Sequence, residues 1–418
     1  MRKIFILFFI SFSCTFAKIQ TLSNIAPVSI EYINLETGFC GEKCLKELAD
    51  NDMLASFMAR FEPSIVSDAK LLELYALLSG KFIPSSNGSN KIAVIIPQKV
   101  IKSYSQVVTN ALIAYIAQTN AKVELKFIMS NDESPQNITN ALNTAREGNF
   151  SYIIAPLTRI GAMILMQNLK QNEFAYIPTI HVSAVTQTMR NVVFGGVDYK
   201  AQIAVLSRLA NEKIVAFSDA SQLGNLLNDY ARISNLTEFY DVAISGKDLK
   251  LDVYLNKKSR YNNSTMFLNL PVIKASLIAT QVRGYEISPY ALLSTQINFI
   301  PNILSVIAER DRQNLYIANS INVQNDDIDD TNALFQTNLK FNWIAYSSSV
   351  GIDYIYSNFI NNTQKRLFKE EPINSQMNYT IQIFKADGYK FEPFDLLNTK
   401  PSESIDDSKN LANSSSIL

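Results

Sequence analysis

The segment KIAVIIPQKVIKSYSQVVTNALIAYIAQTNAKVELKFIMSND, residues 91–132, decides the fold of the chain. Residues 92–96 are apolar at every position, which is typical of a strand buried on both faces. Apolar residues then recur at helical spacing from Tyr104 to Tyr115, and residues 122–128 predict a second strand. A strand, a helix and a strand joined by short connections predict one step of a parallel sheet covered by helices on both faces.

The same alternation continues along residues 91–394. Further apolar strands are predicted at residues 152–156, 177–184 and 213–217, with helical patterns between and after them. We therefore expect an α/β fold in which mainly parallel sheets carry flanking helices.

The length and charge of the chain limit its class. Its 418 residues suffice for two or three domains or for one large two-lobed unit. Lys plus Arg and Asp plus Glu both number 38, so the formal net charge is zero. A polybasic surface is not expected, and we predict neither nucleic acid nor an anionic membrane as a main partner.

The N-terminus, MRKIFILFFISFSCTFAKIQ, predicts a signal peptide over residues 1–17. It has a basic start, an apolar run from Ile4 to Phe12, and a small residue, Ala17, before the expected cleavage site. Cys14 raises lipid anchoring as an alternative, but the bulky residues before it fit that signal poorly. The apolar run is too short to span a bilayer and no later run is long enough, so we expect a periplasmic protein without a transmembrane segment.

Residues 18–82 are expected to form a small helical leader region. Its cysteines, Cys40 and Cys44, predict a local disulfide in an oxidising compartment. We predict no metal site, because a two-cysteine site lacks further ligands and His181 is the only histidine. A polar linker is predicted at residues 83–90.

The last segment, residues 395–418, is polar and poor in large apolar residues, which predicts a disordered tail. One further motif concerns modification. Asn149, in EGNFS, fits the extended acceptor of bacterial N-glycosylation. So short a match arises readily by chance, and glycosylation of Asn149 stays open.

From residue 91 onward, the order of landmarks resembles the type I periplasmic binding-protein family, the fold of the branched-chain amino-acid binding proteins. The first strand ends at a proline in IAVIIP, and a later strand turns a corner in YIIAPLTRIGA. The matching segments that follow are IPTIHVSA, NVVFGGVDYKAQIAVLSRLA, KIVAFSDASQLG, WIAYSSSVGIDYIYSNF and MNYTIQIFKADGYKFEPF, the last a hairpin with Asp387-Gly388 as its turn.

The resemblance implies two lobes, each with a mainly parallel sheet and flanking helices. The first lobe would span residues 91–208 and 301–362, and the second residues 209–300 and 363–394. The chain is also distantly similar in arrangement to the lipoprotein activator of penicillin-binding proteins, which carries the same fold behind an N-terminal helical region.

The resemblance also implies a ligand site. In α/β sheets, ligands bind beyond the carboxyl ends of the strands. Amino-acid binders of the family hold the ligand carboxylate there with hydroxyls and backbone N–H groups. Carried over by position, the first-lobe candidates are Thr158, Ser183, Ala184 through its backbone, and Thr186. The alternative is that these hydroxyls only cap helices.

In the second lobe, the candidates by position are Asp219 and Asn269. Leu223 stands where the family often has a tyrosine that closes over the ligand. An acid for a ligand ammonium is not evident, and Asp219 can also be explained as a turn or cap residue. An ammonium without an acidic partner would be poorly compensated, so the ligand need not be an amino acid.

The residues give little support for catalysis. His181 lies within the predicted strand 177–184, so we expect it to pack in the core rather than act as a base. No phosphate-binding loop and no HExxH motif are present in the sequence. The acidic residues 326–330 are expected in a solvated loop. We therefore expect neither an enzyme nor a cofactor.

Two functions remain as expectations. The first is a non-catalytic periplasmic protein that holds a small ligand in the cleft between the lobes, for transport or sensing. The alternative is a cell-envelope scaffold or regulator that binds a protein partner through a degenerate binding-protein fold.

Overall fold

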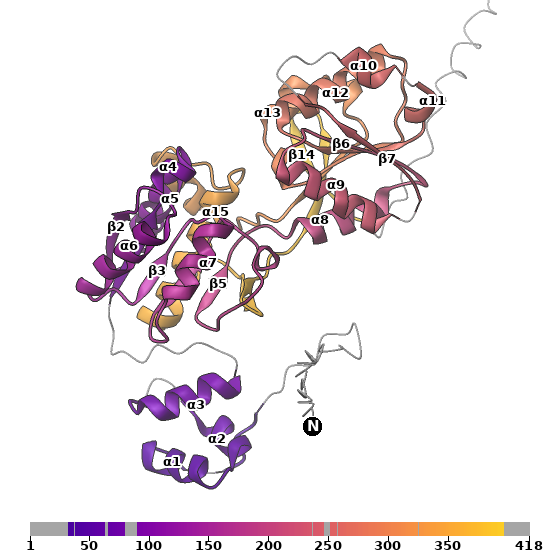
Figure 1. The fold of residues 1–418 in the computed structure, drawn as a ribbon. Helices are drawn as coiled ribbons and strands as arrows, with labels where there is room; N and C mark the ends of the chain where they lie inside the picture. The colour runs from indigo at the N-terminus through magenta and orange to yellow at the C-terminus, as the bar shows by residue number, and fades with distance from the viewer. Residues whose placement is uncertain are drawn as a thin grey trace, which may run out of the picture. The chain divides into compact units, whose positions relative to one another are not determined.

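Two seven-stranded sheets form the larger of the two units into which the chain divides, Gly80–Leu418 (Figure 1). The computed structural model describes residues 32–36, 38–62, 66–79, 90–235, 237–245, 251–256, 258–324 and 326–396. The predicted signal peptide, Cys14, the linker up to residue 89 and the tail from residue 397 lie outside the described residues. Among the described helices, none combines the length and apolar character that crossing a membrane requires.

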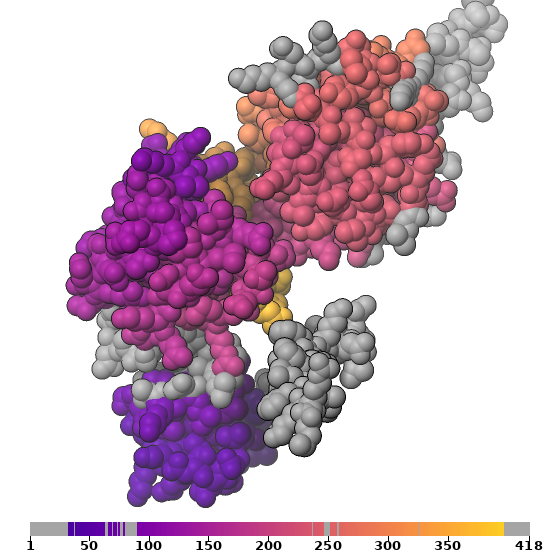
Figure 2. All heavy atoms as spheres, viewed as in Figure 1, coloured from indigo at the N-terminus to yellow at the C-terminus, as the bar shows by residue number. Residues whose placement is uncertain are grey.

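The smaller unit, Met1–Ser79, contains the helical leader, drawn in indigo in Figure 2. Its helices are α1 (Glu42–Asp50), α2 (Leu54–Arg60) and α3 (Ala69–Ser79). A disulfide joins Cys40 to Cys44. The Glu42 carboxylate accepts hydrogen bonds from the backbone and hydroxyl of Ser67, which ties the start of α1 to the segment before α3.

The first sheet belongs to lobe 1 and has the order β11-β12-β5-β4-β3-β1-β2. Every neighbouring pair is parallel except β11 and β12. The strands are β1 (Lys91–Ile96), β2 (Glu124–Met129), β3 (Tyr152–Ile154), β4 (Phe174–Ile177), β5 (Val192–Phe194), β11 (Pro372–Ile373) and β12 (Gln376–Met377).

Helices cover both faces of this sheet, as the apolar character of its inner strands requires. One face packs against α5 (Tyr104–Thr119) and α15 (Trp343–Ile355), with α14 (Asp326–Leu334) beside α5. The other face packs against α6 (Pro135–Glu147) and α7 (Arg159–Asn168). A short helix, α4 (Gln98–Ile101), follows β1.

The second sheet belongs to lobe 2 and has the order β14-β13-β10-β9-β8-β6-β7. Its first five strands along the chain pair in parallel, and the closing hairpin β13–β14 joins β10 in antiparallel fashion. The strands are β6 (Lys213–Ser218), β7 (Glu238–Ala243), β8 (Thr265–Asn269), β9 (Ala291–Ser294), β10 (Leu315–Asn319), β13 (Gln382–Asp387) and β14 (Lys390–Phe394).

Helices α8 (Tyr199–Leu206) and α9 (Gln222–Ser234) pack on one face of this sheet. The helices on the other face are α10 (Leu251–Leu255), α11 (Lys258–Tyr261), α12 (Val272–Gly284) and α13 (Asn302–Val306). The expected α/β class with two mainly parallel sheets is confirmed.

The expected lobe boundaries need correction at two places. Residues 301–319 stay with the second sheet, because β10 pairs with β9 before the chain crosses back. Residues 372–377 return to the first sheet, because β12 pairs with β5. Strands β11 and β12 have only two residues each, too few to show a periodic pattern in the sequence.

Three local expectations also differ from the structure. Strand β4 ends at Ile177, because Pro178 follows and cannot donate to the ladder. The acidic residues 326–330 begin helix α14 instead of forming a loop. In the closing hairpin, Asp387 pairs with Lys390, so the turn is Gly388-Tyr389, one residue later than predicted.

One polar cluster joins two of the segments that connect the lobes. This first crossover cluster consists of Tyr176, Gly195, Ser347 and Tyr379. Gly195 begins the crossing from β5 to α8, and Tyr379 lies in the crossing from β12 to β13. The Gly195 carbonyl oxygen accepts hydrogen bonds from Ser347 Oγ (2.8 Å) and Tyr379 Oη (3.2 Å). Helix α15, through Ser347, therefore fixes both crossings.

A second crossover cluster lies at the lobe 2 end of the connections. Gln202 Nε2 donates to Ser320 Oγ (2.8 Å), and Gln202 Oε1 accepts from the backbone N–H of Gln296 (2.9 Å). Gln296 Oε1 in turn accepts from the backbone N–H of Ser320 (2.7 Å). Gln202, Gln296 and Ser320 are all buried. Their mutual hydrogen bonds therefore fix the chain at Ser320, directly after β10.

Buried acids fasten the return segment before β11 to α15. Asp353 is fully buried and accepts hydrogen bonds from Tyr115 Oη (3.0 Å), Arg366 Nε (3.1 Å) and two backbone amides. Glu370 accepts from Tyr346 Oη, while its Oε2 is buried and has no hydrogen-bond partner in the described chain. Burial raises the pKa of the Glu370 carboxyl above its ordinary value.

Replacing Gly195 with Ala should destabilise lobe 1. A Cβ at this position would collide with Tyr176 Oη and Ser347 Oγ, and overpacking of this kind costs about 1–3 kcal/mol. Chemical denaturation measures the loss. Gly284→Ala is the matched control, because the nearest atom to its Cβ is Gln281 Oε1 at 3.8 Å, so it should be neutral or slightly stabilising. Equal effects of the two substitutions would contradict the packing described for Gly195.

Replacing Glu370 with Gln should change how stability depends on pH. Because the folded pKa of Glu370 is raised, its contribution to stability is complete below the ordinary value of 4.5 and is lost as pH rises through the folded pKa. Gln is neutral throughout, so the stability of Glu370→Gln relative to the native protein should improve as pH rises. Thermal unfolding over this range measures the difference. A difference independent of pH, or an equal trend for the half-exposed Glu392→Gln, would refute the assignment.

Candidate functional site

A cleft of about 1220 Å³ lies in the larger unit and is lined by residues of both lobes. Its walls include the segments that follow β4, β6, β8 and β9, which are the carboxyl ends of parallel strands. Aromatic side chains contribute much of the apolar wall, namely Tyr104, Tyr199, Tyr230, Phe341 and Trp343. The charged or titratable residues of the wall are Arg159, His181, Asp198, Lys200 and Asp219.

Most of the residues expected in the first lobe reach this cleft. Ser183, Ala184 and Thr186 line it, and the side chains of Ser183 and Thr186 are exposed. Thr158 is not among the lining residues. Of the four predicted first-lobe residues, three therefore line the cleft and Thr158 does not.

Thr158 is bonded to a carboxylate of the chain itself. Glu133 Oε1 accepts from the backbone N–H of Thr158 (2.7 Å), and Glu133 Oε2 accepts from the Thr158 hydroxyl and from the backbone N–H of Gly161 (3.2 Å). Glu133 is 8% exposed. A Cβ on Gly161 would lie 2.6 Å from Glu133 Cδ, so only glycine leaves room for this arrangement. The unpaired amides at the start of α7 thus hold an internal carboxylate.

The amides of the second predicted loop are also occupied. The backbone N–H of Val182 donates to Gln376 Oε1 (2.9 Å), that of Ser183 to His181 Nδ1 (3.2 Å), and that of Ala184 to the His181 carbonyl (2.9 Å). The Ala184 backbone, expected to bind a ligand carboxylate, is therefore already paired. Thr186, whose side chain is exposed, also lines the cleft.

His181 is not a packed strand residue, contrary to the expectation. It lies after the end of β4, is half-buried, and lines the cleft. Since its Nδ1 accepts from Ser183, its Nε2 carries the proton and lies 3.7 Å from Asp198 Oδ2. Burial lowers the pKa of His181, and the nearby Asp198 carboxylate opposes that shift. The ring therefore acts as a neutral cap for its own loop.

In the second lobe, Asp219 and Asn269 both line the cleft. Asp219 Oδ1 accepts from the backbone N–H of Ser221 (3.1 Å) and from its hydroxyl, while Ser221 Oγ caps the start of α9. Asp219 thus serves the turn, as the alternative explanation held. Asn269 ends β8 and is fully buried.

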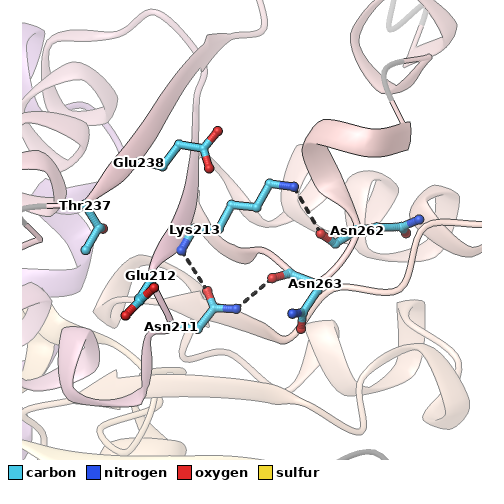
Figure 3. A pocket seen from close by; sticks show the side chains of 7 residues that line it. All are labelled: Asn211, Glu212, Lys213, Thr237, Glu238, Asn262 and Asn263. Atoms are coloured by element: carbon cyan, nitrogen blue, oxygen red, sulfur yellow. Dashed lines mark hydrogen bonds between the residues drawn. The ribbon is translucent and has the colours of Figure 1, made fainter.

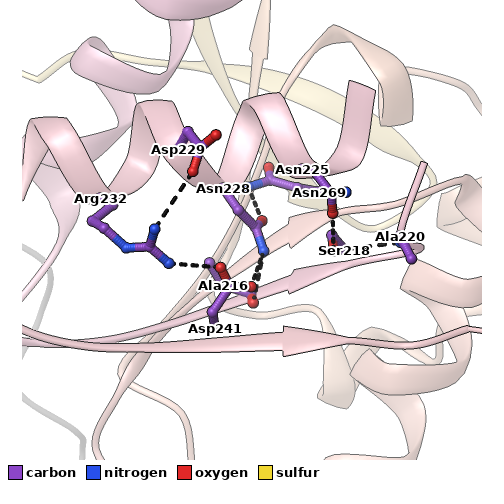
Figure 4. A network of polar contacts seen from close by, with 9 residues as sticks. All are labelled: Ala216, Ser218, Ala220, Asn225, Asn228, Asp229, Arg232, Asp241 and Asn269. Atoms are coloured by element: carbon purple, nitrogen blue, oxygen red, sulfur yellow. Dashed lines mark hydrogen bonds and ion pairs between the residues drawn. The ribbon is translucent and has the colours of Figure 1, made fainter. Parts of the chain in front are cut away.

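Asn269 belongs to a chain of polar contacts that the sequence did not reveal (Figure 4). Asn269 Nδ2 donates to Asn228 Oδ1 (2.9 Å), and Asn228 Nδ2 donates to Asp241 Oδ1 (2.7 Å) and to the Ala216 carbonyl (3.1 Å). Arg232 Nη2 donates to Asp241 Oδ2 (2.6 Å). Asn228 lies on the buried face of α9, and a polar residue on that face was the one available signal.

A second hollow lies at the opposite, amino ends of β6 and β8 (Figure 3). Its polar groups bind one another: Asn211 Oδ1 accepts from the Lys213 backbone N–H (3.2 Å), and Asn211 Nδ2 donates to the Asn263 carbonyl (2.6 Å). Lys213 Nζ donates to the carbonyls of Ser259 (2.6 Å) and Asn262 (3.3 Å). Because the Asn211 and Lys213 side chains are paired and the hollow lies away from the carboxyl ends of the strands, it is not the preferred site.

Within the described residues, no group of three or more His, Cys, Asp or Glu side chains is placed to hold a metal ion. The acidic residues of α14 bond to Lys340 instead, through Asp326 (2.9 Å) and Asp329 (3.2 Å).

No family model and no curated protein matches the sequence. Solved structures match in fold at low identity. The leucine-binding protein LivK from Thermotoga maritima is 12% identical, with a TM-score of 0.53 over 73% of this chain and 97% of that one. A solute-binding protein of an ABC transporter from Rhodopseudomonas palustris BisB5, in complex with 3,4-dihydroxybenzoic acid, is 14% identical, with a TM-score of 0.54 over 73% of this chain and 96% of that one.

LpoA from Haemophilus influenzae is 8% identical, with a TM-score of 0.53 over 84% of this chain and 65% of that one. The match therefore covers somewhat less than two thirds of LpoA. Since the identities are low, these similarities concern the fold. The chain has the two-lobed α/β fold of the type I periplasmic binding proteins.

Proposed function

We propose that this protein is a non-catalytic binding protein that holds a small molecule in the cleft between its lobes, for transport or sensing in the periplasm. The main support for this proposal is the cleft, because it lies at the carboxyl ends of both sheets and its volume of about 1220 Å³ is large enough to hold a small ligand. The location rests on the predicted signal peptide. The structural neighbours named above include proteins that bind leucine and 3,4-dihydroxybenzoic acid.

The ligand is not expected to be an α-amino acid. In the first lobe, Glu133 occupies amides at the start of α7, and the amides of Val182, Ser183 and Ala184 are paired with other groups of the chain. In the second lobe, Asn269 stands where an acid would balance an ammonium group. The backbone amides and the acid with which amino-acid binders of this fold hold the two charged ends are therefore not offered at the corresponding positions of this cleft. The aromatic wall, with Trp343, favours a ligand with apolar or ring surface.

A second candidate function is binding to a protein partner. The helical leader exposes large apolar side chains, with exposed fractions of 70% for Ile33, 89% for Leu35 and 81% for Phe39. If the leader binds a partner, replacing Leu35 and Phe39 with Ser should abolish capture of an envelope protein and leave ligand binding in the cleft unchanged.

Trp343 gives a direct test of the proposed function. It is the only tryptophan of the chain and lines the cleft, so a ligand bound there should change its fluorescence. We expect one or more members of a panel of uncharged aromatic compounds and cell-wall fragments to do so, and to raise stability by about 2.7 kcal/mol at 100 times the dissociation constant. Leucine and other amino acids should have no effect. A panel without any response, together with specific capture of an envelope protein, would refute the binding role.

Replacing Glu133 with Ala should destabilise the protein by about 1–3 kcal/mol, because the buried backbone N–H of Gly161 and the part-buried backbone N–H of Thr158 lose their acceptor. Acetate should then raise the melting temperature of this variant by restoring a carboxylate at the start of α7, and should leave the native protein unchanged. Glu147→Ala removes an exposed glutamate and is the control, with neither effect expected. An equal response of all three proteins to acetate would exclude a specific site.

A further inference from the structure

The turn between α6 and β3 contains the motif EGNFS, residues 147–151. Glu147 and Asn149 are exposed and Ser151 is partly exposed, whereas Phe150 is only 3% exposed. The three residues that define the extended N-glycosylation acceptor therefore lie at the surface, and only the aromatic residue between them packs inward. A surface position is what the attachment of a bulky oligosaccharide requires.

The acid two residues before the asparagine distinguishes this motif from similar ones. The chain contains further Asn-x-Ser/Thr triplets, but only Asn149 has an Asp or Glu two positions earlier. Within the described part of the chain, no ion pair or hydrogen bond uses the Glu147 carboxylate or the Ser151 hydroxyl. Both groups can therefore contact another molecule.

The end of helix α6 explains only one of these residues. Asn149 has a φ of 58°, in the left-handed region, and its backbone N–H donates to the Arg146 carbonyl (3.0 Å). Asparagine adopts this conformation more readily than most residues. The helix end therefore accounts for Asn149, but it requires neither an acid at position 147 nor a hydroxyl at position 151.

The core of lobe 1 holds the turn in place. Phe150 packs in this core, and the ammonium groups of Lys91 and Lys126 lie 5.3 and 5.7 Å from the centre of its ring. Lys91 Nζ also donates to the Gly148 carbonyl (3.2 Å). The turn precedes β3, at the amino end of that strand, and none of residues 147–151 lines the cleft. A group attached to Asn149 would therefore leave the cleft open.

We propose that Asn149 is N-glycosylated, with an oligosaccharide on a polyprenyl diphosphate as the donor. A bond forms between Asn149 Nδ2 and C1 of the first sugar, and the bond between C1 and the diphosphate oxygen breaks. The polyprenyl diphosphate leaves with the electron pair, and the amide nitrogen gives one proton to a base of the transferase. Glu147 supplies the charge and Ser151 the hydroxyl by which the transferase recognises the site.

The burial of Phe150 determines when the transfer takes place. A transferase that binds residues 147–151 has to reach all of them, and in the folded chain the core covers Phe150. Transfer therefore takes place on the newly exported chain, before lobe 1 folds. Asn149 is exposed after folding, so the oligosaccharide extends into solvent. The proposal depends on export through the predicted signal peptide and does not depend on a ligand in the cleft.

The experiment expresses the full chain in bacteria that contain, or lack, an oligosaccharyltransferase and its polyprenyl-linked oligosaccharide. The exported protein is analysed by intact mass and by fragmentation of its peptides. With the transferase, the protein should gain the mass of one oligosaccharide, located on Asn149. An exported reporter with EGNFS in a terminal tag is the positive control.

Variants test each residue of the motif. Asn149→Gln should abolish the modification. Ser151→Ala should also abolish it while keeping Asn149, so the test does not rely on a variant altered at the end of α6. Glu147→Gln should lower the modified fraction about 10-fold or more, because the transferase loses an interaction with a charged group. Circular dichroism confirms that each variant is folded.

The matched control is Asn378→Gln. Asn378 and Thr380 are exposed and form the same kind of triplet, but Gln376 stands where the acid would be, so the modification should be unchanged. Three results would overturn the proposal: no added mass while the reporter is modified, a modification that persists in Asn149→Gln, or equal modification of Glu147→Gln and the native protein. Each of them can occur while ligands still change Trp343 fluorescence, so they are distinguishable from failure of the cleft-binding function.

Discussion

The geometry of the cleft depends on the hydrogen bonds that converge on the carbonyl oxygen of Gly195. Ser347 from α15 and Tyr379 from a later crossing both donate to this oxygen, so segments far apart in sequence meet at one point. Gly195 can occupy that point only because it has no side chain. Val197 and Asp198, which line the cleft, follow within three residues of this point. Hydrogen bonds to the backbone therefore set the position of this part of the cleft wall.

Much of the fold could be predicted from the sequence because its signals are local. Residues 92–96 and 213–217 are apolar without interruption, as strands between two helical layers must be. The short strands β11 and β12 could not be predicted, since two residues show no period. Their place beside β5 depends on tertiary pairing, such as the contact of Gln376 with Phe194.

The site was less accessible to prediction than the fold, and the reason is the distance along the chain between its partners. Glu133 meets Thr158 across 25 residues, and Asn228 meets Asn269 across 41. The sequence around Glu133 and around Asn228 does not indicate the partner of either residue. Position in the fold suggested Ser183, Thr186, Asp219 and Asn269, and all four line the cleft. Position alone did not reveal which of their polar groups form hydrogen bonds within the protein.

The Glu133 carboxylate accepts hydrogen bonds from the amides at the start of α7, so it competes within the molecule with any dissolved carboxylate for these amides. Because the folded chain holds Glu133 beside these amides, a dissolved carboxylate would have to displace it before it could bind there. The ligand class of a cleft can in this way be restricted by a residue that does not form its wall. Gain or loss of one acidic side chain would then change whether a dissolved carboxylate can bind at the start of α7, without any change in the amides that would hold it.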